Sequence, residues 1–278
     1  MGNISAFPYY GAKMKLLKDL LPMLPQADHY CEPFAGSGAV LLNRPRSPIE
    51  TLNDINGEIV HFFKTLRENT AALIGALQLT PYANEEFRMA WQPTDDQIER
   101  ARRFYVRILM DYCKGGAKKD RAFSTNATYD PSQFSYAPLT MMKKVAGLPD
   151  IVARLRLVQI ENRPAVEIIQ KYGHKRTLFY CDPPYLPEVR TSANDYVFEM
   201  SLEDHEELAD ALNQTRAMVA LSGYDNPTMD RLYPPQKWHK TSFKTRRVPM
   251  SRTGTRRTQE VLWTNYNPNT ITQQLALL

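Results

Sequence analysis

The chain has 278 residues, of which 43% are hydrophobic and 23% are charged. This composition supports a sizeable core in one large domain or two modest ones, and it argues against disorder. No apolar run approaches the length of a membrane span and the N-terminus lacks a signal-peptide pattern, so we expect no membrane partner. The three cysteines (Cys31, Cys113 and Cys181) form no CxxC pair, which predicts no metal site and a cytoplasmic location.

The first part of the chain reads as the start of an α/β fold. "HYCEPFAGSGAVLLNR" predicts a short strand ending by Glu32, a glycine loop, and a helix that opens at "AVLLN". "SPIETLNDINGEIV" predicts a second strand ending at Asp54. Together they indicate a βαβ unit with a parallel sheet.

The middle of the chain changes to a helical pattern. From about Glu58 to Arg156, apolar positions recur at helical spacing, as in "EIVHFFKTLRENTAALIGALQL" and "TDDQIERARRFYVRILMDYC". We therefore expect residues 58–156 to form an inserted domain, flanked by the two segments of the α/β domain, 1–57 and 157–278.

The α/β pattern returns near Leu157 and continues to the end. "RLVQIEN", "RTLFYCD" and "AMVALSGY" predict strands, and "AVEIIQKYG" and "LEDHEELADALNQT" predict helices between them. "KWHKTSFKT" and "TQEVLWTNY" predict two further strands joined by a basic connection.

Basic residues gather in three runs, against a formal net charge of +5 and a pI of about 9.0. They are Arg100–Arg107, Lys114–Arg121 and Lys237–Arg257, the last with eight Lys and Arg and no acid. A single run is usually a solvated face, but three runs, two of them interleaved with aromatic residues, favour a nucleic-acid partner.

The glycine loop "EPFAGSG" predicts a ligand site. It lies between a strand and a helix, and Asp54 follows Gly36 by 18 residues, at the end of the next strand. In this arrangement an acid binds ribose hydroxyls while the glycines allow close approach of the backbone. Glu32 would repel a dinucleotide phosphate, so a cation fits better; S-adenosylmethionine carries a sulfonium, an ammonium and a ribose, and no phosphate. The alternative is a tight strand–helix turn without a ligand.

With a further motif, "DPPY" at Asp182–Tyr185, the chain resembles the Dam-type family of DNA N6-adenine methyltransferases. "YYGAK" (Tyr9–Lys13), "EPFAGSG", "NDIN" (Asn53–Asn56) and "DPPY" match the family's motifs in the family's order, over nearly the whole chain. The resemblance implies a Rossmann-like methyltransferase sheet with an inserted, mainly helical target-recognition domain. It also implies S-adenosylmethionine as cofactor and double-stranded DNA as substrate, with a cognate restriction endonuclease as an optional partner.

The chemistry of methylating adenine explains the catalytic motif. The lone pair of the exocyclic N6 amino group is delocalised into the ring, so hydrogen-bond acceptors are needed to turn it toward the methyl group. The Asp182 carboxylate and the Pro183 carbonyl suit that role, while Pro183 and Pro184 hold the loop rigid. Tyr185 offers a ring on which the flipped base can stack.

The resemblance implies further roles, residue by residue. Cofactor contacts are expected from Tyr9, Gly11, Lys13, Glu32, Phe34, Gly36, Gly38, Asp54, Asn162 and Asp182. Asn162 is included because "ENRPAV" replaces the Asp-Phe pair that members often have near the cofactor adenine. DNA contacts are expected from Lys118, Lys119, Arg121 and Asn126 in the insert, from Tyr196 beside Phe198 over the flipped base, and from Arg246, Arg247, Arg256 and Arg257.

Other functions remain open at this point. "CKGGAKKDRAFSTN" does not match the hairpin of GATC-specific members, so the target sequence is not predicted. Methylation of the cytosine amino group uses the same chemistry and related motifs. A DNA-binding protein with a vestigial catalytic site is a third reading, which the intact "DPPY" and glycine loop disfavour, and an RNA or protein substrate is a fourth.

Overall fold

The computed structural model describes residues 4–9, 11, 13–111, 122–125, 136–186, 197–243, 246–249 and 255–270, with the backbone alone for 246–249 and 255–258. Within these ranges, no helix has the length and apolar character needed to cross a membrane.

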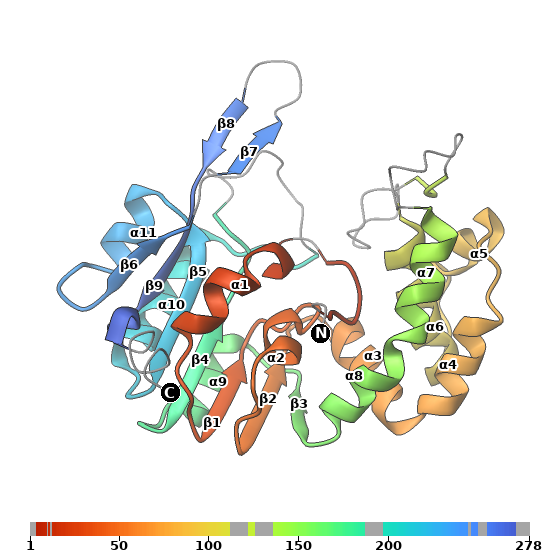
Figure 1. Cartoon of the computed structure of the whole chain (residues 1–278), viewed down its shortest axis with the longest axis horizontal. Helices are drawn as coiled ribbons and strands as arrows, with labels where there is room; N and C mark the ends of the chain where they lie inside the picture. The colour runs from red at the N-terminus through yellow and green to blue at the C-terminus, as the bar shows by residue number, and fades with distance from the viewer. Residues whose placement is uncertain are drawn as a thin grey trace.

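A seven-stranded sheet forms the centre of the α/β part (Figure 1). Its order is β3 (Val158–Glu161), β2 (Ile49–Asn53), β1 (His29–Glu32), β4 (Thr177–Cys181), β5 (Met218–Tyr224), β9 (Glu260–Thr264) and β6 (His239–Ser242). The first five strands are parallel, and β9 pairs antiparallel with both β5 and β6. All seven strands fall in segments where the sequence predicts strands, and the mixed α/β fold is confirmed.

Both faces of the sheet are buried, as expected for parallel strands. Leu178 and Tyr180 of β4 belong to one cluster of buried residues, and Phe179 and Cys181 belong to a second one on the opposite face. This alternation is the two-residue period of a strand. The second face is covered by α9 (Ala165–Tyr172), α10 (Leu202–Gln214) and α11 (Pro227–Leu232). The first carries η1 (Lys13–Lys15), α1 (Leu17–Leu20), η2 (Leu21–Met23) and α2 (Ala39–Asn43).

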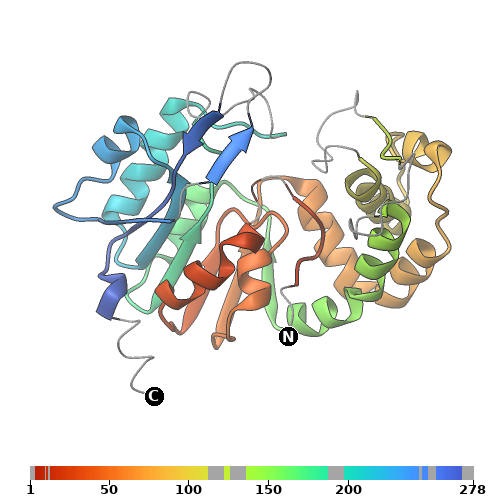
Figure 2. The same ribbon diagram turned by 45° about the horizontal axis from the view of Figure 1, so that its top comes forward.

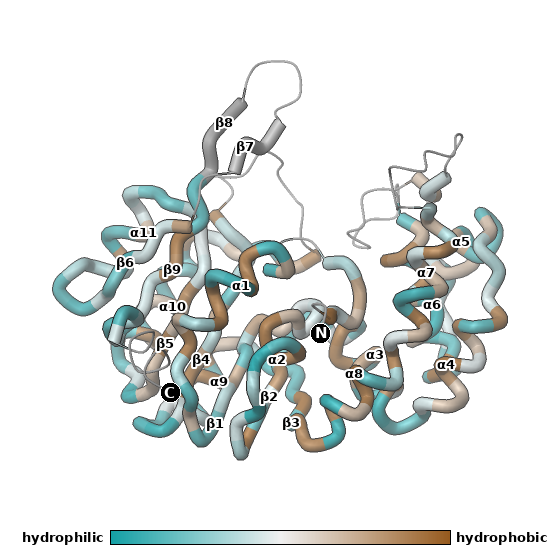
Figure 3. Tube along the Cα trace, in the orientation of Figure 1, coloured by the Kyte–Doolittle hydropathy of each residue, from teal (hydrophilic) through white to brown (hydrophobic). Residues whose placement is uncertain are grey.

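A block of helices lies between β2 and β3 in the chain. It comprises α3 (Gly57–Glu68), α4 (Thr70–Gln78), α5 (Asn84–Met89), α6 (Gln97–Met110), α7 (Ala137–Ala146) and α8 (Leu148–Leu155). The mainly helical character predicted for 58–156 is confirmed in the described part. The core is continuous with the sheet, because Phe7 from the N-terminal segment packs against Phe62, Phe63 and Phe104, and Figure 3 shows hydrophobic stretches in α3 and α8.

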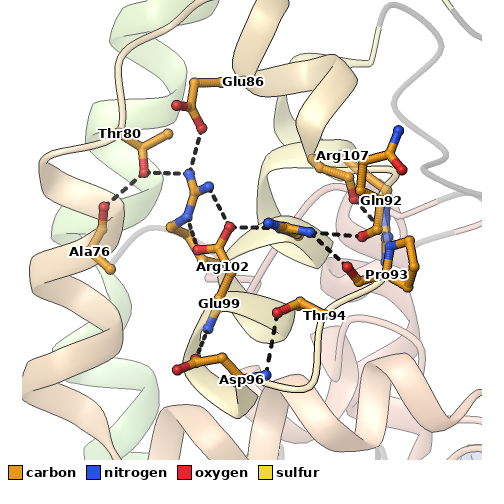
Figure 4. A network of polar contacts seen from close by, with 12 residues as sticks. Ala76, Thr80, Glu86, Gln92, Pro93, Thr94, Asp96, Glu99, Arg102 and Arg107 are labelled. Carbon is orange, nitrogen blue, oxygen red and sulfur yellow. Dashed lines mark hydrogen bonds and ion pairs between the residues drawn. The ribbon is translucent and has the colours of Figure 1, made fainter.

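The arginines of α6 stabilise the helical block, which corrects one expectation. Arg102 pairs with Glu86 at 2.8 Å and with Glu99 at 2.6 Å (Figure 4). Arg103 pairs with Glu99 at 2.6 Å. Arg107 pairs with Glu58 at 2.9 Å. These three arginine side chains are only 13–16% exposed. Because their charges are matched inside the protein, the run Arg100–Arg107 does not form a free basic face for nucleic acid.

The basic connection before β9 contains a second, two-stranded sheet that the sequence does not predict. β7 (Arg246–Pro249) pairs antiparallel with β8 (Thr255–Thr258), and Arg247 lies opposite Arg257. In both ribbon views the hairpin extends beyond the central sheet, and the helical block lies on the side of β3 (Figures 1 and 2). The hairpin therefore projects away from the core in a chain segment rich in arginine.

Candidate active site

Three acids follow parallel strands and meet at one edge of the sheet. Glu32 ends β1, Asp54 comes directly after β2, and Asp182 comes directly after β4. β2 and β3 lie on one side of β1, and β4 and β5 lie on its other side, so the strand order reverses direction between β1 and β4. Ligands of open parallel sheets bind beyond the strand ends at such a switch point. A pocket lies there, and all three acids line it.

The glycine loop curves over the pocket in left-handed backbone conformations. Gly36 has φ of +49° and Gly38 has φ of +66°, which disfavour any residue with a Cβ. A Cβ at Gly36 would also lie 3.0 Å from Cδ1 of Tyr9. The ring of Tyr9 therefore packs directly on the loop, and both residues line the pocket.

Asp54 holds the loop in place. Its Oδ2 accepts a hydrogen bond from the Gly36 backbone N–H at 2.8 Å, and its Oδ1 accepts one from the Asn56 N–H at 2.9 Å. Burial raises the pKa of Asp54 to about 6, although these two hydrogen bonds act in the opposite direction. The Asp54 carboxylate therefore accepts two backbone hydrogen bonds, and it also lines the pocket.

Glu32 is the most deeply buried acid of the pocket, with 2% of its surface exposed. The Tyr30 hydroxyl donates to its Oε1 at 2.8 Å, and the Arg44 guanidinium lies 3.9 Å from the centre of the Tyr30 ring. Burial raises the pKa of Glu32 to about 8, since these partners offset only part of the desolvation. A cationic ligand would favour the ionised form of this acid.

The loop that follows β4, Asp182–Tyr185, is here called the catalytic loop, and two of its side chains join Lys13 and Glu260 in a polar cluster. Lys13 Nζ donates to both oxygens of Asp182 at 2.7 Å and lies 3.3 Å from Oε1 of Glu260. The Tyr185 hydroxyl is 2.8 Å from Glu260 Oε1 and 3.2 Å from Asp182 Oδ1. Burial lowers the pKa of Lys13, but the two carboxylates outweigh it and the net shift is upward. For Asp182, burial raises the pKa, and the nearby Lys13 ammonium offsets only part of this increase.

The backbone of the catalytic loop is anchored from α10. The ring of His205, which is buried, makes a hydrogen bond of 3.0 Å to the Pro184 carbonyl. Pro184 lines the pocket together with Asp182, whereas Pro183 and Tyr185 face a smaller cavity on the other side. The loop therefore presents the Asp182 carboxylate to the pocket from a fixed backbone.

Comparison with known proteins identifies the chemistry that this arrangement serves. The family described as D12 class N6 adenine-specific DNA methyltransferase matches residues 9–246, which include every pocket residue discussed above. The chain belongs to this family. It is therefore an enzyme that methylates adenine in DNA, which favours adenine N6 over the cytosine amino group and over a binding protein without activity.

Individual relatives agree with the family. The "DNA N-6-adenine-methyltransferase" of Escherichia phage P1 is 28% identical over 82% of this chain, and the match covers 31% of that protein. "Type II methyltransferase M1.LlaDCHI" of Lactococcus lactis subsp. cremoris is 24% identical over 92% of this chain and 93% of its own. A "DNA adenine methylase" of Vibrio cholerae is 26% identical over 80% of this chain and 82% of its own. This chain thus spans less than a third of the phage protein but most of the other two.

Most of the residues predicted to bind the cofactor line the methyltransferase pocket. They are Tyr9, Gly11, Lys13, Glu32, Phe34, Gly36, Asp54 and Asp182. Gly38 lies behind the loop against Leu52 and Phe63. Asn162 does not line the pocket, because its amide donates to the backbone carbonyls of Asp54 at 2.7 Å and Ile55 at 3.2 Å. Its predicted contact with the cofactor adenine stays a prediction.

Tyr185 is more buried than a stacking platform needs to be. Its ring is 7% exposed and packs edge-on against Tyr224, with ring centres 4.6 Å apart. Its hydroxyl, for which the sequence offers no role, is engaged with two carboxylates. Stacking of the target base on this ring stays a prediction.

The predicted DNA contacts are only partly represented. Lys118, Lys119, Arg121, Asn126 and Tyr196 lie outside the described residues, as does Cys113. The backbone of Arg246, Arg247, Arg256 and Arg257 belongs to the β7–β8 hairpin. Phe198, which the sequence pairs with Tyr196 over the flipped base, lines the pocket and is 46% exposed.

Several pocket residues lie within or next to the motifs, although the sequence predicts no role for them. Ile55 and Asn56 belong to "NDIN", Ser37 belongs to "EPFAGSG", and Ala39 and Val40 follow that loop directly, so their positions are the signal that could have found them. Glu260 is different, because the sequence places it only in a predicted late strand, 75 residues after Tyr185. Among the described residues, no group of three His, Cys, Asp or Glu side chains is placed to hold a metal ion.

Proposed function

We propose that the enzyme binds S-adenosylmethionine in the pocket at the strand ends and methylates an adenine that has been flipped out of duplex DNA. The proposal is carried by one observation: Asp182 lines the same pocket as the two buried acids Glu32 and Asp54. The hydrogen-bond acceptor for adenine and the two acids for the cofactor therefore line one pocket.

The residues of the pocket fit this cofactor. Among the described lining residues, Lys13 is the one cation, and Asp182 and Glu260 already neutralise it. No positive group there remains to bind a phosphate, whereas Glu32 and Asp54 suit a cation and a ribose. Glu32, Phe34 and Gly36 would hold the methionine part and Asp54 the ribose. When bound, S-adenosylmethionine supplies an electrophilic methyl carbon.

The catalytic loop would act on the amino group of adenine. Asp182 accepts one N–H and the Pro183 carbonyl the other, which turns the nitrogen lone pair out of the ring. The His205 contact to Pro184 and the two prolines hold these acceptors before the base arrives, so little reorganisation is needed. A paired base cannot reach a buried carboxylate, and flipping it out costs a few kcal/mol.

We propose that residues 58–156 form the target-recognition domain, and that Lys114–Asn126 read base edges. Support comes from the position of the helical block, which is inserted between β2 and β3 in the chain and lies to one side of the central sheet (Figure 2). Arg121→Ala and Asn126→Ala, followed by sequencing of the methylated sites, test this assignment. Relaxed preference at one base supports readout, and a uniform fall in methylation would reassign the residues to phosphate contacts.

We also propose that the enzyme works in the cytoplasm and needs no metal; a restriction endonuclease would be a functional partner only. The buried free thiols of Cys31 and Cys181 suit a reducing compartment.

The direct test of the proposed function combines two measurements on the purified enzyme. Calorimetry should show S-adenosylmethionine binding, and mass spectrometry of incubated duplex DNA should show N6-methyladenine. Methylcytosine in the product would overturn it.

A further inference from the structure

Glu260 reaches the catalytic loop because β9 runs against the rest of the sheet. It is the first residue of β9 and pairs with Tyr224, the last residue of β5. In an antiparallel neighbour, the start of one strand lies beside the end of the other. Glu260 therefore lies at the same sheet edge as Asp182, although no motif residue is near it in sequence.

The Tyr185 hydroxyl bridges the two carboxylates. It lies 3.2 Å from Asp182 Oδ1 and 2.8 Å from Glu260 Oε1, so its single proton favours Glu260 while its oxygen can accept from Asp182. Asp182 lines the cofactor pocket and Glu260 does not. The Glu260 side chain is 21% exposed, so it has access to water outside the pocket.

The reaction creates a proton that must leave this site. Methyl transfer forms a bond from adenine N6 to the methyl carbon and breaks the bond of that carbon to sulfur, which keeps the electron pair. The N6 atom then carries a methyl group, two protons and a positive charge. Neutral N6-methyladenine forms only when one of these protons is lost. A base that contacts Asp182 from the pocket would cover the side of this carboxylate that lines the pocket, so we expect direct loss of the proton to water to be slow.

We infer that Glu260 is the terminal acceptor of this proton, which it receives from Asp182 through the Tyr185 hydroxyl; the inference rests on the proposed function. The proton passes from N6 to Asp182, and from Asp182 to the Tyr185 oxygen as the Tyr185 proton passes to Glu260. Asp182 ends as a carboxylate again, and Tyr185 is neutral before and after. Glu260 then releases the proton to water.

The charges of the cluster suit such a relay. Two carboxylates share the single ammonium of Lys13, which leaves the buried group with an excess negative charge. Tyr180 and Glu32 line the pocket together with Asp182 and interact with it electrostatically, and the Tyr180 hydroxyl shares a hydrogen bond of 2.9 Å with Ser222. Burial and the Glu260 charge raise the pKa of Asp182, which makes it a better transient base.

Two isosteric variants remove the relay without removing Asp182: Glu260→Gln and Tyr185→Phe. We expect each to lower the single-turnover rate of methyl transfer at pH 7.5 by about tenfold or more, the lower end of what proton transfer contributes. The double variant should be no slower than the slower single one, because either change already interrupts the path. The rates of the variants should continue to rise with pH where the wild-type rate is level, since hydroxide replaces the relay.

A second readout needs no reaction. In carbon-13 NMR of the ligand-free protein, Glu260→Gln should lower the pH at which the Asp182 carboxyl titrates, because it removes a neighbouring negative charge. For Glu260→Gln, the affinities for S-adenosylmethionine and duplex DNA should stay within about twofold of wild type, because Glu260 does not line the cofactor pocket. Glu206→Gln and Tyr172→Phe are the matched controls, since both change surface hydrogen bonds elsewhere.

The outcomes separate this inference from the proposed function. A wild-type enzyme that binds no S-adenosylmethionine or makes no N6-methyladenine would refute the proposed function itself. A normal wild type with Glu260→Gln at the wild-type rate across the pH range would refute the relay alone. Losses that multiply in the double variant would also refute it, because they would show two independent roles.

Discussion

Lys13 Nζ lies 2.7 Å from both Oδ1 and Oδ2 of Asp182, across 169 residues of sequence. The N-terminal "YYGAK" segment is thereby joined to the catalytic loop. In the ligand-free enzyme, the carboxylate that would receive adenine is already engaged by a cation. Adenine must therefore share Asp182 with Lys13 or displace its ammonium toward Glu260, which is 3.3 Å away.

This ion pair predicts a pH-dependent loss of stability in Lys13→Met. Without the ammonium, ionised Asp182 is buried next to Glu260, and the free energy of unfolding should fall by up to about 3 kcal/mol at pH 8. The loss should be smaller at pH 5, because burial and the Glu260 charge raise the pKa of Asp182 and so favour its neutral form as the pH falls. Thermal unfolding at both pH values measures this. The double variant Lys13→Met/Asp182→Asn should recover most of the loss at pH 8; the absence of any recovery would show that Lys13 acts through other contacts.

The two buried acids predict that cofactor binding strengthens as pH rises. The pKa is about 8 for Glu32 and about 6 for Asp54, so between pH 5.5 and 8.5 both change from neutral acid to carboxylate in the free enzyme. A cationic cofactor binds the carboxylate forms, so its Kd should fall over this window and binding near pH 7 should release protons. Calorimetry in buffers of different ionisation enthalpy detects that release. A Kd independent of pH would remove Glu32 from the cofactor site.

The same burial predicts that Glu32→Gln stabilises the ligand-free enzyme. A carboxyl whose pKa is raised on folding keeps its contribution to stability at low pH and loses it as pH rises toward the folded value. The variant has no such loss, so its Tm should exceed the wild-type Tm by an amount that grows from pH 5 to pH 9. The variant should meanwhile bind S-adenosylmethionine more weakly. A Tm difference that is constant across this range would contradict the raised pKa.

Gly36→Ala should impair the pocket through backbone strain and contact with Tyr9. The left-handed conformation costs a residue with a Cβ about 1–2 kcal/mol, and the new methyl would lie 3.0 Å from the Tyr9 ring. We expect weaker S-adenosylmethionine binding and a lower Tm. Gly75→Ala is the control, because this helical glycine has open space around it and should gain about 0.5–1 kcal/mol. Unchanged binding in Gly36→Ala would show that the loop adapts.

The arginines of the hairpin and of α6 should differ in their effect on DNA binding. If Arg247 contacts a phosphate, Arg247→Gln should lower the slope of log affinity against log salt by about one unit and weaken binding to all sequences alike. Arg103→Gln should leave the slope unchanged and lower the Tm, because Arg103 pairs with Glu99 inside the helical block. Fluorescence anisotropy at several salt concentrations gives both slopes. Equal slopes for wild type and Arg247→Gln would show that Arg247 makes no phosphate contact and lies on a solvated surface.

The sequence predicts those features that depend on local pattern. Strand ends at Glu32, Asp54 and Asp182 could be placed because apolar runs stop there, and parallel strands bring such ends to one edge. The run at Arg100–Arg107 predicts a basic face, but the sequence of such a run is the same whether its charges face solvent or are paired inside the protein. In the structure, Arg102 pairs with Glu86 and Glu99. Glu86 is 16 residues from Arg102, and Glu58 is 49 residues from Arg107. Partners at such separations in a helical block are not visible in a linear pattern.

Glu260 and the Tyr185 hydroxyl show where sequence reasoning ends. Glu260 reaches the site only because β9 is antiparallel, and strand direction is decided by how the last connections pack, which no short motif records. "DPPY" predicts a ring beside the target base, and the structure adds that the hydroxyl of this ring joins two carboxylates. Contacts of this kind depend on distances between elements rather than on residue order.

The central claim, that Asp182 activates the amino group of adenine while Asp54 serves the cofactor, is tested most directly by the single-turnover rate of methyl transfer to duplex DNA. For Asp182→Asn we predict a fall of about a hundredfold or more, as for loss of one preorganised polar group, with S-adenosylmethionine affinity within a few-fold of wild type. Asp54→Asn, measured beside it at saturating cofactor, should retain most of the rate and lose affinity instead. Equal rates for wild type and Asp182→Asn would contradict the account.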